Sequence, residues 1–356
     1  MDSSQDPNTD DQILHQAFAD AGLELLGVAS VASPHETDQA RQRYHDWLDQ
    51  GRHGTMRYLE RHEAAKYQPQ AILEGTKSVL VTGISYGQER PPLVPGEGLV
   101  ARYAWGRDYH KVLLKKLKTV EGQLQLLWPQ ERWRAFTDTA PLDERWWSER
   151  AGASFTARNS LAINRKLGSM FVLGEILTTR AFTATGPLDH AHGSCPSGCR
   201  RCSAVCPTGA LDEQGRIDAR LCLSYLTIEH RGPIEDKLKP QLGNWLFGCD
   251  LCQEVCPFNL TAPRTKEPEF LAWKAGPSLP LNSLLALDDQ AFTAKFGGSP
   301  VHRTGRNGLV RNACLVAANQ KRYELLEVLQ CLTADSDEGV ADAARWAVDQ
   351  LQGRPS

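Results

Sequence analysis

The sequence lacks a strong excess of either charge, any long apolar run and the usual export signals. Its 356 residues carry a formal net charge of −3, so affinity for a polyanion would have to come from a local basic patch. No apolar stretch reaches the roughly 18 residues that a membrane-spanning helix needs. Residues 1–11 are polar and acidic, with neither the basic start and apolar core of a signal peptide nor a twin-arginine motif. These absences predict a cytoplasmic protein with no membrane segment, in which thiols stay reduced.

Common nucleotide- and RNA-binding signatures are missing as well. No G-x-G-x-x-G run follows a predicted strand and there is no P-loop, so binding of a nicotinamide or nucleotide is not supported. We also find no RNP1 run, KH loop or zinc knuckle. The composition, 41% hydrophobic and 23% charged, is that of a globular protein. A chain of this length allows one large domain or two to three smaller ones.

Cysteine is the residue in which the chain is rich, because eight of its ten cysteines lie between Cys195 and Cys256. Two runs end in Cys-x3-Cys-Pro, and one cysteine lies between them. Such short spacings let thiolates converge on one iron–sulfur cube, and in two-cluster ferredoxins the last cysteine of each run ligates the other cluster. Applied here, one [4Fe–4S] cluster takes Cys195, Cys199, Cys202 and Cys256, and the second takes Cys206, Cys222, Cys249 and Cys252.

Disulfides or zinc would account for these cysteines less well than two clusters do. A disulfide framework would need an oxidising compartment, which nothing in the sequence indicates. Zinc ribbons use pairs of C-x2-C, whereas these runs continue as x2-x3-Pro. Two clusters in one module usually mean that electrons pass through it, so we expect a redox protein.

Apolar periodicity divides the rest of the chain into three parts that follow a disordered tail, residues 1–10. Strands are predicted over 78–86, 99–105, 133–137 and 170–178, and helices over 11–28, 37–67, 108–128 and 142–151. This alternation predicts an α+β fold, with an α/β cofactor domain over 11–185. A ferredoxin-like two-cluster module follows over 186–263. Short amphipathic helices over 301–319, 323–332 and 340–351 predict a HEAT-like tail over 264–356.

Several polar residues outside the cysteine run are candidates for chemistry. Asp138 follows a predicted strand and could act as a general acid, although an aspartate here more often forms the turn or N-cap before the next helix. His110 could be a ligand or base, although a histidine in the first turn of a helix is more often structural. Basic residues gather at 111–118 and 302–322, which leaves open a surface for a phosphate backbone.

Several segments, in one order, resemble the epoxyqueuosine reductase family. They are ARYAWGRDYHKVL (101–113), TDTAPLDER (137–145), ERAGASFTARN (149–159), the cysteine run, LCLSYLTIEHRG (221–232) and GCDLCQEVCPFN (248–259). The resemblance extends from about residue 11 into the helical tail. It implies a cobalamin-dependent enzyme that removes the epoxide oxygen of epoxyqueuosine at the wobble position of tRNA, in the last step of queuosine synthesis.

The resemblance also implies roles for individual residues. Asp138 matches the family's proposed proton donor and a cofactor contact, and Arg61, Asn159 and Ser224 match positions near the cobalamin. The two clusters would pass electrons to that cobalamin from a donor that the sequence does not identify. The expected partner is the anticodon stem-loop of a tRNA with a GUN anticodon, and the expected state is a monomer. No D-x-H-x-x-G segment supplies a histidine ligand, so we expect cobalamin to bind without one.

The chain departs from the family pattern at two places. Its first cysteine run opens with Cys195-x3-Cys199, one residue longer than usual, and residues 154–159 read SFTARN where relatives often have G-W-x-G-K-N. Two alternatives therefore remain beside the family assignment. One is a related cobalamin and iron–sulfur reductase, of the reductive dehalogenase kind, that acts on a small molecule. The other is an electron-transfer protein without substrate chemistry of its own.

Overall fold

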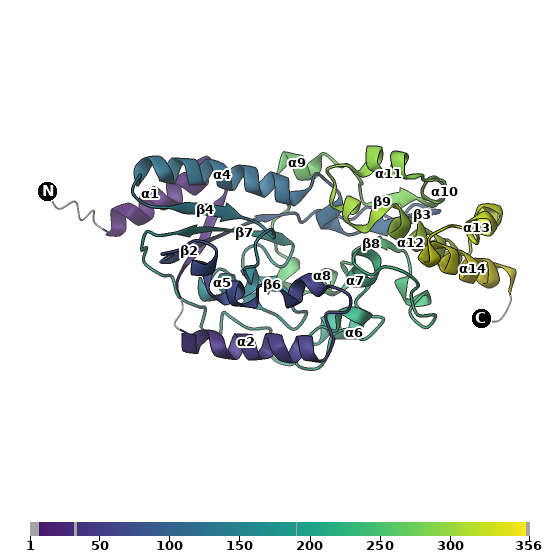
Figure 1. The fold of residues 1–356 in the computed structure, drawn as a ribbon, viewed down its shortest axis with the longest axis horizontal. Helices are drawn as coiled ribbons and strands as arrows, with labels where there is room; N and C mark the ends of the chain where they lie inside the picture. The colour runs from purple at the N-terminus through teal and green to yellow at the C-terminus, as the bar shows by residue number, and fades with distance from the viewer. Residues whose placement is uncertain (1–6, 32–33, 190, 354–356) are drawn as a thin grey trace.

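A four-stranded antiparallel sheet forms the centre of the first half of the molecule. The computed structural model describes residues 7–31, 34–189 and 191–353 (Figure 1). The strand order is β1 (Glu24–Ser30), β2 (Ser78–Ser85), β7 (Phe171–Thr178) and β4 (Trp133–Phe136), and each neighbouring pair is antiparallel. The strands are rich in Val, Ile, Leu and Phe, which suit a sheet that is buried on both faces.

Helices cover both faces of this sheet. Helices α1 (Pro7–Asp20) and α4 (Tyr109–Leu127) lie side by side on one face (Figure 1). The buried side of α4 packs with α1 and the strands into one apolar core. Helix α5 (Glu144–Arg150) packs against the opposite face, where Trp147 joins a second core. Asp108 caps α4 by accepting the backbone N–H of His110 at 3.1 Å, which fixes where that helix begins.

The second half is built around another sheet and a set of short helices. Its strand order is β8 (Trp245–Phe247), β3 (Glu97–Val100) and β9 (Ser278–Pro280). One apolar core joins this sheet to helices α7 (Leu223–Ile228), α10 (Leu281–Leu285), α12 (Gly305–Asn319) and α14 (Glu338–Gln352). The C-terminal helices therefore pack on the cysteine-rich region.

The remaining elements are one long helix, α2, and a set of short helices and strands. They are α2 (Pro34–Asp49), α3 (Glu63–Tyr67), β5 (Phe155–Thr156), β6 (Ala162–Ile163), α6 (Arg201–Val205), α8 (Leu251–Glu254), α9 (Pro268–Leu271), α11 (Asp289–Phe296) and α13 (Leu326–Leu332). Among the described residues, no helix is both long and apolar enough to cross a membrane.

The structure confirms a mixed fold of helices and strands and corrects several boundaries. The predicted helix 11–28 is wrong in its second half, because α1 ends at Asp20, Gly22 turns the chain with φ +68°, and β1 follows. The predicted tail 1–10 is too long, since α1 begins at Pro7, while residues 1–6 lie outside the described ranges. The helix expected over 37–67 is two helices separated by a 3-10 turn at Arg57–Glu60.

The strand predicted over 99–105 also differs from the structure. Strand β3 is Glu97–Val100, and Arg102–Ala104 forms a 3-10 turn. This strand pairs with β8 and β9 and so belongs to the second sheet, although the sequence placed it within the domain 11–185. The chain thus crosses from the first half to the second and back before the cysteine run begins.

Candidate functional site

The eight cysteines of the run fall into two groups in space. Cys195, Cys202 and Cys199 lie near enough to Cys256 for the charge of their thiolates to act on it. Burial, and then this repulsion, raises the pKa of Cys256. The same four cysteines line one small apolar pocket. Burial and repulsion from Cys222, Cys202 and Cys206 likewise raise the pKa of Cys252, and Cys222 and Cys252 act in the same way on Cys249. The division of the eight cysteines into two ligand sets stays a prediction from their spacing, and Cys202 and Cys252 interact across the two predicted sets.

The pocket lined by Cys195, Cys199, Cys202 and Cys256 also contains an unpaired hydrogen-bond donor that could bind a cluster held by these thiols. Asn159 lines this pocket and is only 3% exposed. Its side-chain oxygen accepts the Leu161 N–H at 3.3 Å, while its Nδ2 is buried without a hydrogen-bond partner among the described residues. A buried amide N–H in a pocket lined by thiols suits a hydrogen bond to the sulfur of an iron–sulfur cluster.

A buried ion-pair network fixes the loop of the second group. Asp250 lies between Cys249 and Cys252 and is 1% exposed. Its Oδ2 accepts hydrogen bonds from Arg90 Nη2 at 2.6 Å and Arg102 Nη1 at 2.9 Å, and from the Arg102 backbone N–H at 3.0 Å. Glu254, one turn further along α8, pairs with the same two arginines. The segments before and after β3 thereby hold in place the loop with Cys249 and the start of α8 with Cys252.

Asp138 lies at the end of β4 in a strained backbone conformation. Its φ is +48°, in the left-handed region that a residue with a Cβ seldom adopts. The Tyr109 hydroxyl donates to Asp138 Oδ2 at 2.6 Å, and His110 Nε2 lies 3.5 Å from the same oxygen. On its other side, His110 Nδ1 lies 2.7 Å from Asp108 Oδ1. The N-terminus of α4 therefore presents a tyrosine and a histidine to one carboxylate.

The protonation states of this group follow from its contacts. Burial raises the pKa of Asp138, but the hydrogen bonds from His110 and Tyr109, and the charges of His110 and Arg303, outweigh it and leave the pKa lowered. Burial lowers the pKa of His110, yet its bonds to Asp108 and Asp138 outweigh that and raise it to about 9. At neutral pH the protein therefore carries an ionised Asp138 beside a protonated His110.

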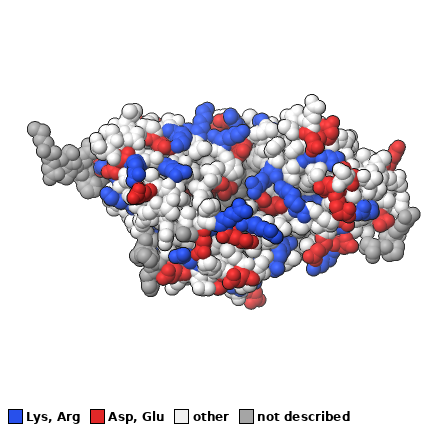
Figure 2. Space-filling model, in the orientation of Figure 1, with Lys and Arg blue, Asp and Glu red and all other residues white. Residues whose placement is uncertain are grey.

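The rim around Asp138 contains groups suited to a large polar ligand. The Asp138 side chain is 63% exposed, so the carboxylate opens on to the surface. Arg303 donates to both carboxylate oxygens of Glu229, at 2.9 and 3.2 Å, and lies over the exposed ring of Tyr58 at 5.6 Å. Figure 2 shows Lys and Arg side chains gathered near the middle of one face, with acidic side chains among them.

The other predicted contacts occupy different places. Arg61 is exposed and ends the 3-10 turn that carries Tyr58. Ser224 is half-buried on α7 beside Tyr225, whose hydroxyl accepts the Thr55 N–H at 2.8 Å. These two residues thus lie on segments that touch each other near the rim. Asn159 lines the pocket of the first cysteine group instead.

The sequence missed residues that the structure brings to Asp138. Tyr109 stood beside the candidate His110 without being singled out, and only the turn at the start of α4 shows that its hydroxyl reaches the carboxylate. Glu229 lay within the segment 221–232 that resembles the family, but it was not singled out. The basic run 302–322 was read as a surface, but Arg311 is 2% exposed and donates to the carbonyls of Leu226, His230 and Gly232.

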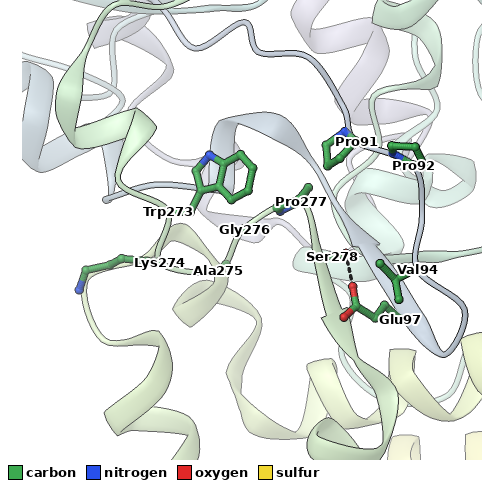
Figure 3. A pocket seen from close by; sticks show the side chains of 10 residues that line it. All are labelled: Pro91, Pro92, Val94, Glu97, Trp273, Lys274, Ala275, Gly276, Pro277 and Ser278. Carbon is green, nitrogen blue, oxygen red and sulfur yellow. Dashed lines mark hydrogen bonds between the residues drawn. The ribbon is translucent and has the colours of Figure 1, made fainter.

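A separate hollow lies between the segment before β3 and the segment before β9. It is lined by Pro91, Pro92, Val94, Glu97, Trp273 and residues 274–278. Figure 3 shows the Trp273 ring on one side and Pro91 and Pro92 on the other. The Trp273 indole N–H donates to Gln88 Oε1 at 2.9 Å. This hollow shares no lining residue with the Asp138 site or the cysteine pocket.

Comparison with known proteins places these features in a class. Residues 195–259 match the family model described as a 4Fe-4S double cluster binding domain. The class is therefore that of redox proteins with two [4Fe–4S] clusters. Residues 66–139, which end just past Asp138, match the model described as Epoxyqueuosine reductase QueG, DUF1730.

Whole-chain relatives make the assignment more specific. An epoxyqueuosine reductase of Pseudomonas aeruginosa is 35% identical over 349 residues, covering 94% of each chain. The enzyme of Escherichia coli K12 is 33% identical over 359 residues, covering 98% of this chain and 92% of its own. This chain belongs to the epoxyqueuosine reductase family and is an oxidoreductase.

Solved structures agree with this assignment. One is an epoxyqueuosine reductase with an epoxyqueuosine-modified tRNA-Tyr stem loop; its TM-score is 0.88 at 28% identity, covering 97% of this chain and 91% of that chain. Another, from Bacillus subtilis, has its catalytic loop swung out of the active site; its TM-score is 0.87 at 26% identity, with the same coverage.

Proposed function

We propose that this protein reduces epoxyqueuosine to queuosine at the wobble position of tRNA, with cobalamin as its second kind of cofactor. The observation that carries the proposal is the Asp138 group: an exposed carboxylate, bonded by Tyr109 and facing His110, in a chain of the epoxyqueuosine reductase family. The reaction consumes two electrons and two protons, and it converts the epoxide to an alkene and water. The protein therefore has to deliver protons as well as electrons.

The residues around Asp138 fit a large planar cofactor. The carboxylate is open on one side, and Tyr58, Arg61 and Ser224 come from segments that meet near it. Cys222 of the second cysteine group begins α7, two residues before Ser224, so the cluster and the cofactor would be neighbours. When bound, reduced cobalamin supplies the nucleophile or electron donor that opens the epoxide, and the clusters supply its electrons. We assign Arg61 and Ser224 to its periphery and Asn159 to the first cluster.

His110 and Asp138 together can hold and move the proton that the reaction needs. At neutral pH the proton resides on His110, whose pKa is about 9. A tRNA base and a cofactor that cover the exposed Asp138 remove water from it, and lost hydration raises the pKa of a carboxyl. The proton then passes from His110 Nε2 to Asp138 Oδ2, and from there to the leaving alkoxide. Asp108, bonded to Nδ1, keeps the imidazole oriented for this transfer.

The tRNA would approach over the rim formed by Tyr58 and Arg303. An exposed aromatic ring offers a stacking surface to a base, and a guanidinium pairs with phosphate. The helices beyond residue 264, which we still interpret as HEAT-like, place Arg303 on this rim. We further propose that the protein works as a cytoplasmic monomer. We also propose three functional parts, 11–185, 186–263 and 264–356, although β3 ties the first to the others.

The test is an anaerobic reaction of the protein, carrying its clusters and cobalamin, with a strong reductant and a stem-loop that contains epoxyqueuosine. Nucleoside mass spectrometry should show loss of one oxygen from the modified base. Asp138→Asn should bind cobalamin, seen in its absorption spectrum, and lower turnover by roughly 10²-fold or more. Unchanged epoxyqueuosine with both cofactors bound would overturn the proposal and favour a small-molecule reductase. Full turnover by Asp138→Asn would overturn the role of Asp138.

A further inference from the structure

A buried carboxyl lies in the apolar core beneath the Asp138 site. Glu175 is on β7, opposite Val81 of β2 and Phe136 of β4, and is 0% exposed. Its strand neighbours on the same face, Leu173 and Leu177, belong to the apolar core that α5 covers. An ionised carboxylate in such surroundings costs several kcal/mol unless it is paired, so this glutamate needs an explanation.

The group that faces Glu175 is a second carboxyl. Neither oxygen of Glu175 accepts a hydrogen bond from an N–H or O–H donor among the described residues. Helix α5 packs against β7, and Glu144, in the first turn of α5, is the acid that after burial most raises the pKa of Glu175. Two carboxylates that meet without a donor repel each other, whereas one proton between them makes a strong hydrogen bond.

Glu144 also holds the backbone of the catalytic candidate. The backbone N–H of Asp138 donates to Glu144 Oε1. The preceding residue, Thr137, is fully buried, and its hydroxyl donates to the Leu173 carbonyl at 2.7 Å. Asp138 itself keeps a φ of +48°, which costs on the order of 1 kcal/mol or more and persists only where neighbouring contacts enforce it. Glu144 supplies one of these contacts.

We propose that Glu144 and Glu175 share a single proton, and that this proton holds the Asp138 loop in its observed conformation. With the proton in place, the pair carries one negative charge and Glu144 accepts the Asp138 N–H. Without it, the buried carboxylate of Glu175 and the half-buried carboxylate of Glu144 repel each other and also repel ionised Asp138, so Glu144 moves and the loop is released. Glu144 and Glu175 are positioning residues in this account, since they act through Asp138.

The other charged groups around Glu144 and Glu175 shift the pKa of the shared proton, but they do not replace the pair as the group that titrates. Asp143 and Asp138 add negative charge and favour the shared proton, whereas protonated His110 opposes it. Arg134, on the edge strand β4, lies over Phe136 and donates to the Ile72 carbonyl. Tyr109 binds Asp138. Burial and then repulsion from Asp138 raise the pKa of Glu144 to about 8, and burial and then repulsion from Glu144 raise the pKa of Glu175 well above its ordinary value. The loop should therefore loosen above about pH 8.

Hydrogen exchange of residues 137–143, followed by mass spectrometry on the cluster-containing protein, tests this without substrate or cobalamin. Protection factors are compared at pH 7 and pH 9.5 for the wild type, Glu175→Gln and Glu144→Gln. An introduced amide donates to the remaining carboxylate, as the proton does, and does not ionise. Glu149→Gln, an exposed acid on the same helix, is the matched control.

We expect protection of the loop to fall on the order of tenfold in the wild type and in Glu149→Gln, because one unit of pKa corresponds to a tenfold change. It should fall less than about twofold in Glu175→Gln and Glu144→Gln. Constant protection in the wild type would overturn the proposal. An equal fall in all variants would overturn it too, and would assign the change to His110.

The importance of the loop for turnover rests on the proposed function, but the exchange result does not. If the pair controls the loop as described and the tRNA reaction also occurs, the alkaline limb of kcat should move to higher pH in Glu175→Gln. If the exchange pattern appears while epoxyqueuosine stays unchanged, the shared proton stands and the proposed function fails. If turnover occurs and the exchange pattern is absent, the proposed function stands and the shared proton is refuted.

Discussion

Replacing Asp250 should damage the second cysteine group through the ion pairs that fix its loop. The carboxylate is 1% exposed and is held by Arg90 at 2.6 Å and by Arg102 at 2.9 Å. Asp250→Asn keeps the size of the side chain and removes its charge. Two largely buried guanidinium groups then share Glu254 alone, which the solvent reaches more easily.

The size of the effect can be worked from these contacts. At an effective dielectric of about 20, a charge pair near 2.9 Å attracts by roughly 6 kcal/mol, most of which offsets the cost of desolvation. Removing one partner of a buried pair leaves the other charge uncompensated and typically costs about 3–5 kcal/mol. Because Glu254 remains, we expect about 3 kcal/mol for Asp250→Asn. Glu254→Gln, whose side chain is 30% exposed and leaves Asp250 in place, should cost about 1 kcal/mol or less.

Urea unfolding followed by tryptophan fluorescence measures this difference. Arg90 lies over Trp105 at 5.2 Å and over Trp245 at 4.9 Å, so the signal reports on this region. Iron content after reconstitution should fall for Asp250→Asn and stay near the wild-type value for Glu254→Gln. Equal losses of unfolding free energy in the two variants, or less than about 1 kcal/mol for Asp250→Asn, would refute the assignment of the buried pairs as the main support of this loop.

Three further changes test other parts of the site. Cys256→Ser should reduce the iron content from two clusters to one, whereas Cys314→Ser, at a buried cysteine outside the run, should leave both, as metal analysis would show. His110→Gln removes the group that holds the proton up to about pH 9, so turnover at neutral pH should fall and its alkaline limb should move to lower pH; an unmoved profile would contradict the coupling. Arg303→Gln should weaken binding of the stem-loop and reduce the slope of log affinity against log salt by about 1, which an unchanged slope would disprove.

The two cysteine groups were predictable because their chemistry depends on local spacing. Runs of Cys-x2-Cys and Cys-x3-Cys-Pro bring thiols together within a few residues of chain, whatever the rest of the fold does. The exchange of Cys206 and Cys256 between the groups is what the ferredoxin pattern predicts, and it stays a prediction. The helix that begins at Tyr109 was also predictable, since apolar periodicity and the Asp108 cap are local signals.

What sequence reasoning missed depends on contacts between distant segments. Strand β1 was read as the end of a helix, because Leu23 and Leu26 fit helical spacing and only pairing with β2 makes the segment a strand. Strand β3 was assigned to the first domain, yet its partners lie about 145 and 180 residues further along the chain, at Trp245 and Ser278. Local patterns cannot show which segment will complete a sheet.

Two charged residues, Arg311 and Glu175, were misjudged from the sequence because they are buried, and buried charges carry the most information about function. Arg311 was counted in a basic surface, but three backbone carbonyls bind it inside the core, and its pKa is lowered to about 10, chiefly by burial. Glu175 went unnoticed within an apolar strand for the same reason: a sequence does not reveal which face of a strand is covered. The two cases differ in what burial does to them. Arg311 is bound by three carbonyl acceptors and is structural, whereas Glu175 faces only another acid, Glu144, so its place in the core requires a proton. Glu144 in turn accepts the backbone N–H of Asp138, which links that proton to the candidate catalytic residue.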